Sequence, residues 1–78
     1  MPTTAQQLEM ALDIFRHFDA KPGQLIATNS FAAVADNRGW DVGDVHKGLG
    51  HAVVTGLVLN EPIGSYKLTE LGYKKMNT

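Results

Sequence analysis

The fold is decided by the stretch FAAVADNRGWD, residues 31–41. Its first half predicts a short helix with Phe31 and Val34 on one face, because residues three or four apart lie one above the other on a helix. Gly39 is expected to end this helix, since glycine readily adopts the left-handed conformation that closes a carboxyl end. Asp41 is expected to begin the next helix as its N-cap. The stretch therefore predicts two short helices joined by a tight turn.

The second of these helices is predicted to span about residues 41–55 and to end at Gly56. Counted at about 100° per residue, its apolar residues fall within roughly 100° of arc, the pattern of a helix buried along one face. These residues are Val42, Val45, Leu49, Ala52 and Val53. The opposite face is expected to be exposed, and it carries Gly43, Asp44, Lys47, Gly50, His51 and Val54.

An earlier helix is predicted from about Thr4 to Asp19, where Thr4 and Gln7 fit a capping box. Its core-facing residues recur at helical spacing: Leu8, Ala11, Leu12, Phe15 and Phe18. Met10 and Ile14 widen the apolar arc to roughly 200°, twice the usual stripe of an amphipathic helix. We therefore expect this helix to contact a second partner, either the C-terminal helix or another subunit of a homodimer.

The rest of the chain predicts a small amount of β-structure. Leu25-Ile26 suits a short bridge to a hairpin, and residues 57–68 read as that hairpin, with a turn at Pro62-Ile63-Gly64. Thr69 is expected to cap a short last helix that ends near Met76 and buries Leu71. The predicted fold class is α+β: three core helices, a C-terminal two-stranded hairpin and a short final helix.

Composition limits the class of protein. The chain has 78 residues, no cysteine and 44% apolar residues, which predicts one domain over residues 1–78 held together by packing. Seven basic and eight acidic side chains give a formal charge of −1, which excludes a strongly basic nucleic-acid binder of the histone type. The longest apolar run is too short for a membrane span, and the first residues lack a signal-peptide pattern. We therefore expect a cytoplasmic protein without a membrane partner.

The order of these elements resembles the winged-helix family, a helix-turn-helix followed by a β-hairpin wing. The resemblance covers about residues 8–76 and is carried by Phe31-Ala32-Ala33-Val34-Ala35, by the Val45, Leu49 and Val53 spacing, and by Ser65-Tyr66-Lys67-Leu68-Thr69-Glu70-Leu71-Gly72. The last stretch is similar to the Y-x-L-T-x-x-G run that closes the wing in small bacterial winged-helix transcriptional regulators. The resemblance implies a DNA-binding regulator that acts as a dimer, with the 41–55 helix in the major groove and the 57–68 hairpin as the wing.

Mapped onto this sequence, the resemblance implies a set of candidate residues for contact with double-stranded DNA. They are Arg38, Gly43, Lys47, Gly50, His51, Ser65 and Lys67. Lys47 is the best candidate for a base edge, since a cation in mid-helix can donate to guanine acceptors. The alternative is a surface lysine paired with Asp44 one turn earlier. Asp44 itself argues against DNA binding, because a carboxylate repels phosphate.

Arg38 and the glycines have two interpretations each. Arg38 either meets a phosphate or stays within the protein, where it caps carbonyl groups or pairs with Asp36 or Asp41. Each glycine inside a helix costs up to ~1 kcal/mol relative to alanine, so each calls for an explanation. Close packing is favoured for Gly48, and close approach of a partner to the helix surface is favoured for Gly50.

Catalysis and metal binding have little support in the sequence. His46 and His51 are five residues apart, so they point about 140° away from each other on a helix and cannot share a metal ion. The chain has no phosphate-binding glycine loop and no nucleophile motif. A domain this small also offers no evident small-molecule pocket. We therefore expect neither an enzyme nor a cofactor.

Two hypotheses of function remain open. The first is a winged-helix regulator that binds DNA. The second is a winged-helix module for protein–protein contact, which is favoured by the near-zero charge, by Asp44, and by the exposed apolar candidates Val54 and Ile63.

Overall fold

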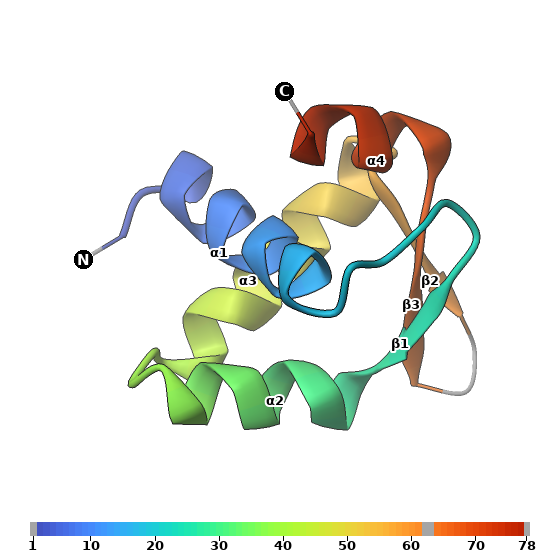
Figure 1. Cartoon of the computed structure of the whole chain (residues 1–78). Coiled ribbons are helices and arrows are strands. Elements are labelled where there is room, and N and C mark those ends of the chain that lie inside the picture. Colours follow the sequence, from blue (N-terminus) through green and yellow to red (C-terminus); the bar gives the residue numbers. More distant parts are fainter. Residues whose placement is uncertain (1, 62–63, 78) are drawn as a thin grey trace.

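A computed structural model describes residues 2–61 and 64–77 of the chain. The described residues form an α+β fold of four helices and a three-stranded antiparallel sheet (Figure 1). In chain order the elements are α1 (Thr4–His17), β1 (Leu25–Ala27), α2 (Thr28–Asn37), α3 (Val42–Val54), β2 (Val58–Glu61), β3 (Ser65–Leu68) and α4 (Glu70–Met76). None of the helices in these two ranges is long and apolar enough to cross a membrane.

The sheet has one strand more than the sequence predicted. Its strand order is β1-β3-β2, so the hairpin formed by β2 and β3 is joined by β1, which precedes α2 (Figure 1). The expected bridge at Leu25 and Ile26 extends over three residues, and Leu25 lies opposite Lys67 of β3. The backbone N–H and the hydroxyl of Thr28 both donate to the carbonyl oxygen of Gly64, at 2.9 and 2.6 Å. The start of α2 is thereby fixed to the hairpin.

The core lies where α1, α2 and α3 meet the inner face of the sheet. Phe15 and Phe31 are fully buried, and their rings meet edge to face with centroids 5.1 Å apart. Tyr66 of β3 extends this contact, with its ring centroid 5.7 Å from that of Phe31. The α1 and α3 backbones approach closely at Gly48, where a Cβ atom would overlap the carbonyl oxygen of Gln7. Close packing, the interpretation favoured for Gly48, is confirmed.

The carboxyl end of α2 and the amino ends of α3 and α4 are capped by the residues that the sequence predicts. Gly39 has a φ of +73°, as required of a glycine that closes α2. The Asp41 side chain accepts the backbone N–H of Gly43 at 2.8 Å, and the Thr69 hydroxyl accepts that of Gly72 at 3.0 Å. The turn between α2 and α3 is therefore specified locally by its own residues.

The predicted cap of α1 was wrong by one residue. The capping box consists of Thr3 and Gln6: the Thr3 hydroxyl accepts the Gln6 N–H at 3.1 Å, and the Gln6 side chain accepts the Thr3 N–H at 2.7 Å. Gln7 is free for another partner and donates to Asp44 of α3. This one-residue shift lets the first turn of α1 bind the first turn of α3.

One core-facing prediction for α1 was wrong, because Phe18 is 39% exposed. Of the two second partners expected for α1, the structure shows the C-terminal helix: Ile14 is fully buried, and α1 packs against α2 and α4 as well as α3. The wide apolar arc of α1 is thus covered largely within one chain. Leu71, expected in the core, is exposed, whereas Met76 is buried. Helix α4 packs against the rest of the chain through the face that carries Gly72. A Cβ atom at Gly72 would overlap the carbonyl oxygen of Leu57.

Candidate nucleic-acid interface

The exposed surface of α3 is a continuous stripe that we call the outer face of α3. Its residues are Gly43, His46, Lys47, Gly50, His51 and Val54, all of them exposed. It lies opposite the buried residues Val45, Gly48, Leu49 and Ala52, because α1 packs on that inner side. The sequence reasoning did not place His46 on this face. His46 precedes Gly50 by four residues, which places the two about 40° apart around a helix. This spacing alone could have predicted that His46 shares the face of Gly50.

Lys47 is available for an external partner. It makes no hydrogen bond and no ion pair with any residue that the structure describes. The predicted alternative, a pair with Asp44, is not formed. Asp44 is half-buried and instead accepts a hydrogen bond from Nε2 of Gln7 at 2.9 Å. Asp44 thus joins α3 to α1, and its carboxylate is partly turned away from the outer face of α3.

The two glycines on the outer face of α3 have different surroundings. A Cβ atom at Gly50 would meet nothing within 4 Å, so no neighbour in the fold requires glycine there. A Cβ atom at Gly43 would lie 3.1 Å from Oδ1 of Asp41, which caps the helix through the Gly43 N–H. Gly43 therefore serves the N-cap, and Gly50 leaves the helix backbone open to a partner.

The structure separates the two candidate residues of the hairpin. Lys67 is partly exposed and pairs with Glu61 of the neighbouring strand, with Nζ 3.5 Å from Oε1. Ser65, expected near the DNA, is only 7% exposed, so little of its side chain is open to a partner. The reason is its position on the central strand, where it lies between Ala27 of β1 and Glu61 of β2. Among the described residues its hydroxyl has no hydrogen-bond partner.

Arg38 is held within the protein. Its guanidinium pairs with the carboxylate of Asp13 on α1 and lies over the Trp40 ring, with Cζ 4.9 Å from the ring centroid. The predicted partners Asp36 and Asp41 were wrong, because α1 brings a third carboxylate to the turn. Arg38 therefore braces the α2–α3 turn against α1.

Exposed apolar side chains lie on the outer surface of the sheet as well as on α3. Leu25 and Leu59 are each 49% exposed, and both are register partners of Lys67, one on each side. Val54, at the end of the outer face of α3, is 82% exposed. The prediction of an exposed Ile63 lies outside the described residues.

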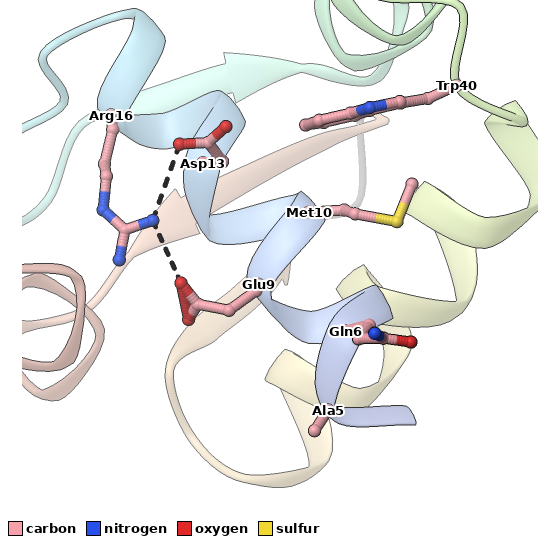
Figure 2. A pocket seen from close by; sticks show the side chains of 7 residues that line it. All are labelled: Ala5, Gln6, Glu9, Met10, Asp13, Arg16 and Trp40. Carbon is pink, nitrogen blue, oxygen red and sulfur yellow. Dashed lines mark hydrogen bonds and ion pairs between the residues drawn. The ribbon is translucent and has the colours of Figure 1, made fainter. Parts of the chain in front are cut away.

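A groove that was not predicted from the sequence runs along α1 (Figure 2). Its volume is about 460 Å³, and it is lined by Ala5, Gln6, Glu9, Met10, Asp13, Arg16 and Trp40. Met10, a candidate for a dimer face, thus lines a groove. In the described part of the chain, no three histidine, cysteine, aspartate or glutamate side chains are grouped so as to hold a metal ion.

Comparison with protein-family models, with curated proteins and with solved structures gives no match.

Proposed function

We propose that this chain is a winged-helix DNA-binding protein of the transcription-regulator type, in which α3 enters the major groove of a DNA duplex and the β2–β3 hairpin contacts the backbone as the wing. The observation that carries the proposal is Lys47, a cation at the centre of an exposed helix face that has no partner among the residues the structure describes. That helix follows a tight, locally capped turn after α2 and is followed at once by the hairpin. This order of elements is the one that the family resemblance implies.

The outer face of α3 suits close approach to DNA in two further respects. Gly50 leaves the helix backbone uncovered on this side, so that a base edge or phosphate can come near it. The Asp44 carboxylate, which argued against DNA binding in the sequence, is engaged by Gln7. His46 and His51 add two imidazole groups that can donate to phosphate oxygens or base edges.

The small number of cations sets the strength of the proposed interaction. Binding affinity for B-DNA falls with salt by a logarithmic slope of about 0.9 per neutralised phosphate. Lys47 supplies one such contact directly, and Lys67 supplies a second when it leaves Glu61. We therefore expect weak binding by one copy, detectable at low salt.

Fluorescence anisotropy with a labelled duplex at low salt tests the proposal. Lys47→Ala should weaken binding roughly threefold to tenfold and lower the salt slope by about one. Lys21→Ala is the matched control, because it removes the same charge from the turn that follows α1. The proposal fails if the wild-type protein binds no duplex, or if the two variants weaken binding equally.

A second candidate function is contact with another protein through the outer surface of the sheet. It is favoured by the two half-exposed leucines, Leu25 and Leu59, and by the ion pair that neutralises Lys67 between them. A Leu59→Lys variant distinguishes the two functions. It adds a cation to the hairpin, so DNA binding should hold or strengthen, whereas binding to an apolar protein partner should be lost.

A further inference from the structure

Two histidines lie at opposite edges of the outer face of α3. His46 and His51 are five residues apart, which places them about 140° apart around the helix. Gly50 lies about 40° from His46, and Lys47 lies about 40° from His51, so Gly50 and Lys47 occupy the middle of the face. The face therefore has open backbone and one cation at its centre, with one imidazole at each edge.

The positions of the two imidazoles fit the two strands of a duplex. An α-helix with its side chains is about 10–12 Å across, and the major groove of B-DNA is about 12 Å wide. A helix that fills the groove presents the centre of its outer face to the base edges and the two sides of that face to the phosphates. With α3 in the groove, His46 therefore faces the backbone of one strand and His51 that of the other.

Neither imidazole has a partner in the described part of the chain. Both side chains are exposed, and neither ring makes a hydrogen bond or an ion pair there. Helices α1 and α2 and strand β2 pack against α3. The titratable or charged side chains on these elements and on the first half of α3 and its cap are Glu9, Asp13, Arg16, His17, Asp36, Asp41, Asp44, Lys47 and Glu61. All of these carboxylates except Asp36 have partners of their own.

From this arrangement we infer that His46 and His51 bind DNA phosphates in their protonated form, one on each strand, so that binding of the duplex is coupled to proton uptake. The inference rests on the proposed function and specifies the contacts and the pH dependence of the same site. Histidine commonly changes charge between pH 5 and 8, and its protonated ring has two N–H donors. Protonation of both rings raises the number of cations on the outer face of α3 from one, Lys47, to three.

Fluorescence anisotropy with a labelled duplex at pH 7.5 and at pH 5.5, at the same low ionic strength, tests the inference. The wild-type protein should bind roughly tenfold more tightly at pH 5.5, about threefold for each histidine. Its salt slope should rise by about two, because two more phosphates are neutralised. The double variant with His46→Gln and His51→Gln should lose this gain and keep the affinity that the wild type has at pH 7.5. Each single variant should lose about half of the gain on a logarithmic scale.

The matched control is His17→Gln, which removes the third histidine of the chain. His17 is exposed at the end of α1, where its ring packs on that of Phe18, and it should not alter the gain at pH 5.5. Circular dichroism at both pH values verifies that each variant is folded.

The outcomes separate this inference from the proposed function. If the wild type binds at pH 7.5 and Lys47→Ala weakens that binding, but the affinity does not rise at pH 5.5, only the inference is overturned. It is also overturned if the double variant keeps the gain, or if His17→Gln loses as much of it as either single variant. Loss of the whole gain in one single variant would contradict contact with both strands. Absence of binding at both pH values overturns the inference and the proposed function together.

Discussion

The inner and outer faces of α3 use glycine in opposite ways. At Gly48, on the inner face, any Cβ atom would overlap the carbonyl oxygen of Gln7, so the contact between α1 and α3 requires glycine. At Gly50, two residues further on, a Cβ atom would meet nothing within 4 Å. Glycine costs up to ~1 kcal/mol inside a helix, and only at Gly48 does the packing within the chain offset that cost. The outer face of α3 is therefore the face on which we propose that DNA is accommodated.

The largest effect is expected at the inner face. Gly48→Ala should lower the free energy of unfolding by roughly 3 kcal/mol, because an added methyl group must push two backbones apart. Chemical denaturation measures this change, with Gly50→Ala as the matched control on the same helix. A loss below about 0.5 kcal/mol would mean that the close approach of α1 and α3 does not exist in solution.

A smaller effect is expected at the link between the first turns of α1 and α3. Gln7→Ala and Asp44→Ala each remove the hydrogen bond between Nε2 and the carboxylate, and each should cost about 1–2 kcal/mol. In a double-mutant cycle the coupling energy should be about 1 kcal/mol, since the two changes remove the same bond. If the losses of stability in the two single variants simply add in the double variant, Asp44 does not bind Gln7 in solution. Its carboxylate would then be free to repel DNA phosphates at the outer face of α3.

Gly50→Ala is expected to have a still smaller effect, of opposite sign. It should raise the free energy of unfolding by about 0.5–1 kcal/mol, because alanine favours the helix and the site is open. Gly50→Leu should keep the fold but weaken the binding of duplex DNA, since its side chain covers the uncovered backbone. Thermal unfolding and anisotropy measure the two effects. Destabilisation by Gly50→Ala would contradict the open surroundings of this glycine.

The smallest effect concerns an ion pair away from α3. The hydrogen bond and charge of Asp19, and then the charge of Tyr73, raise the pKa of Lys21 above its ordinary value of 10.5. The stabilisation of the folded state by this pair is fully present below pH 10.5. It is lost as the pH rises through the raised pKa that Lys21 has in the folded protein. Asp19→Asn should lower the Lys21 pKa in an NMR titration and should lower stability at neutral pH only slightly, because the pair is exposed to solvent. Asparagine suits the φ of 51° at this position. An unchanged Lys21 pKa would contradict the pair.

The sequence predicted the elements whose signals are local. Gly39 and Asp41 specify the turn between α2 and α3 through a left-handed backbone and a side-chain cap, and both roles need only neighbouring residues. The burial of Ile14 could not be predicted in the same way. It depends on how α2 and α4 pack around α1, and those contacts join distant parts of the chain.

The candidate site shows the same division. The helical period placed Lys47 and Gly50 correctly on an exposed face, because orientation along one helix is a local property. It did not reveal that Asp13 would bind Arg38, nor that Gln7 would bind Asp44, since these pairs join different helices. The groove along α1 was missed for the same reason, because Trp40 reaches it from the α2–α3 turn.

The most direct test of the central claim is NMR chemical-shift mapping of the uniformly labelled protein during titration with duplex DNA at low salt. We expect the largest amide shifts at Gly43, Lys47, Gly50 and His51 and in the β2–β3 hairpin, with the groove along α1 unchanged. The shifts should diminish as salt is added. Shifts that avoid the outer face of α3, or the absence of any shift at low salt, would contradict the account.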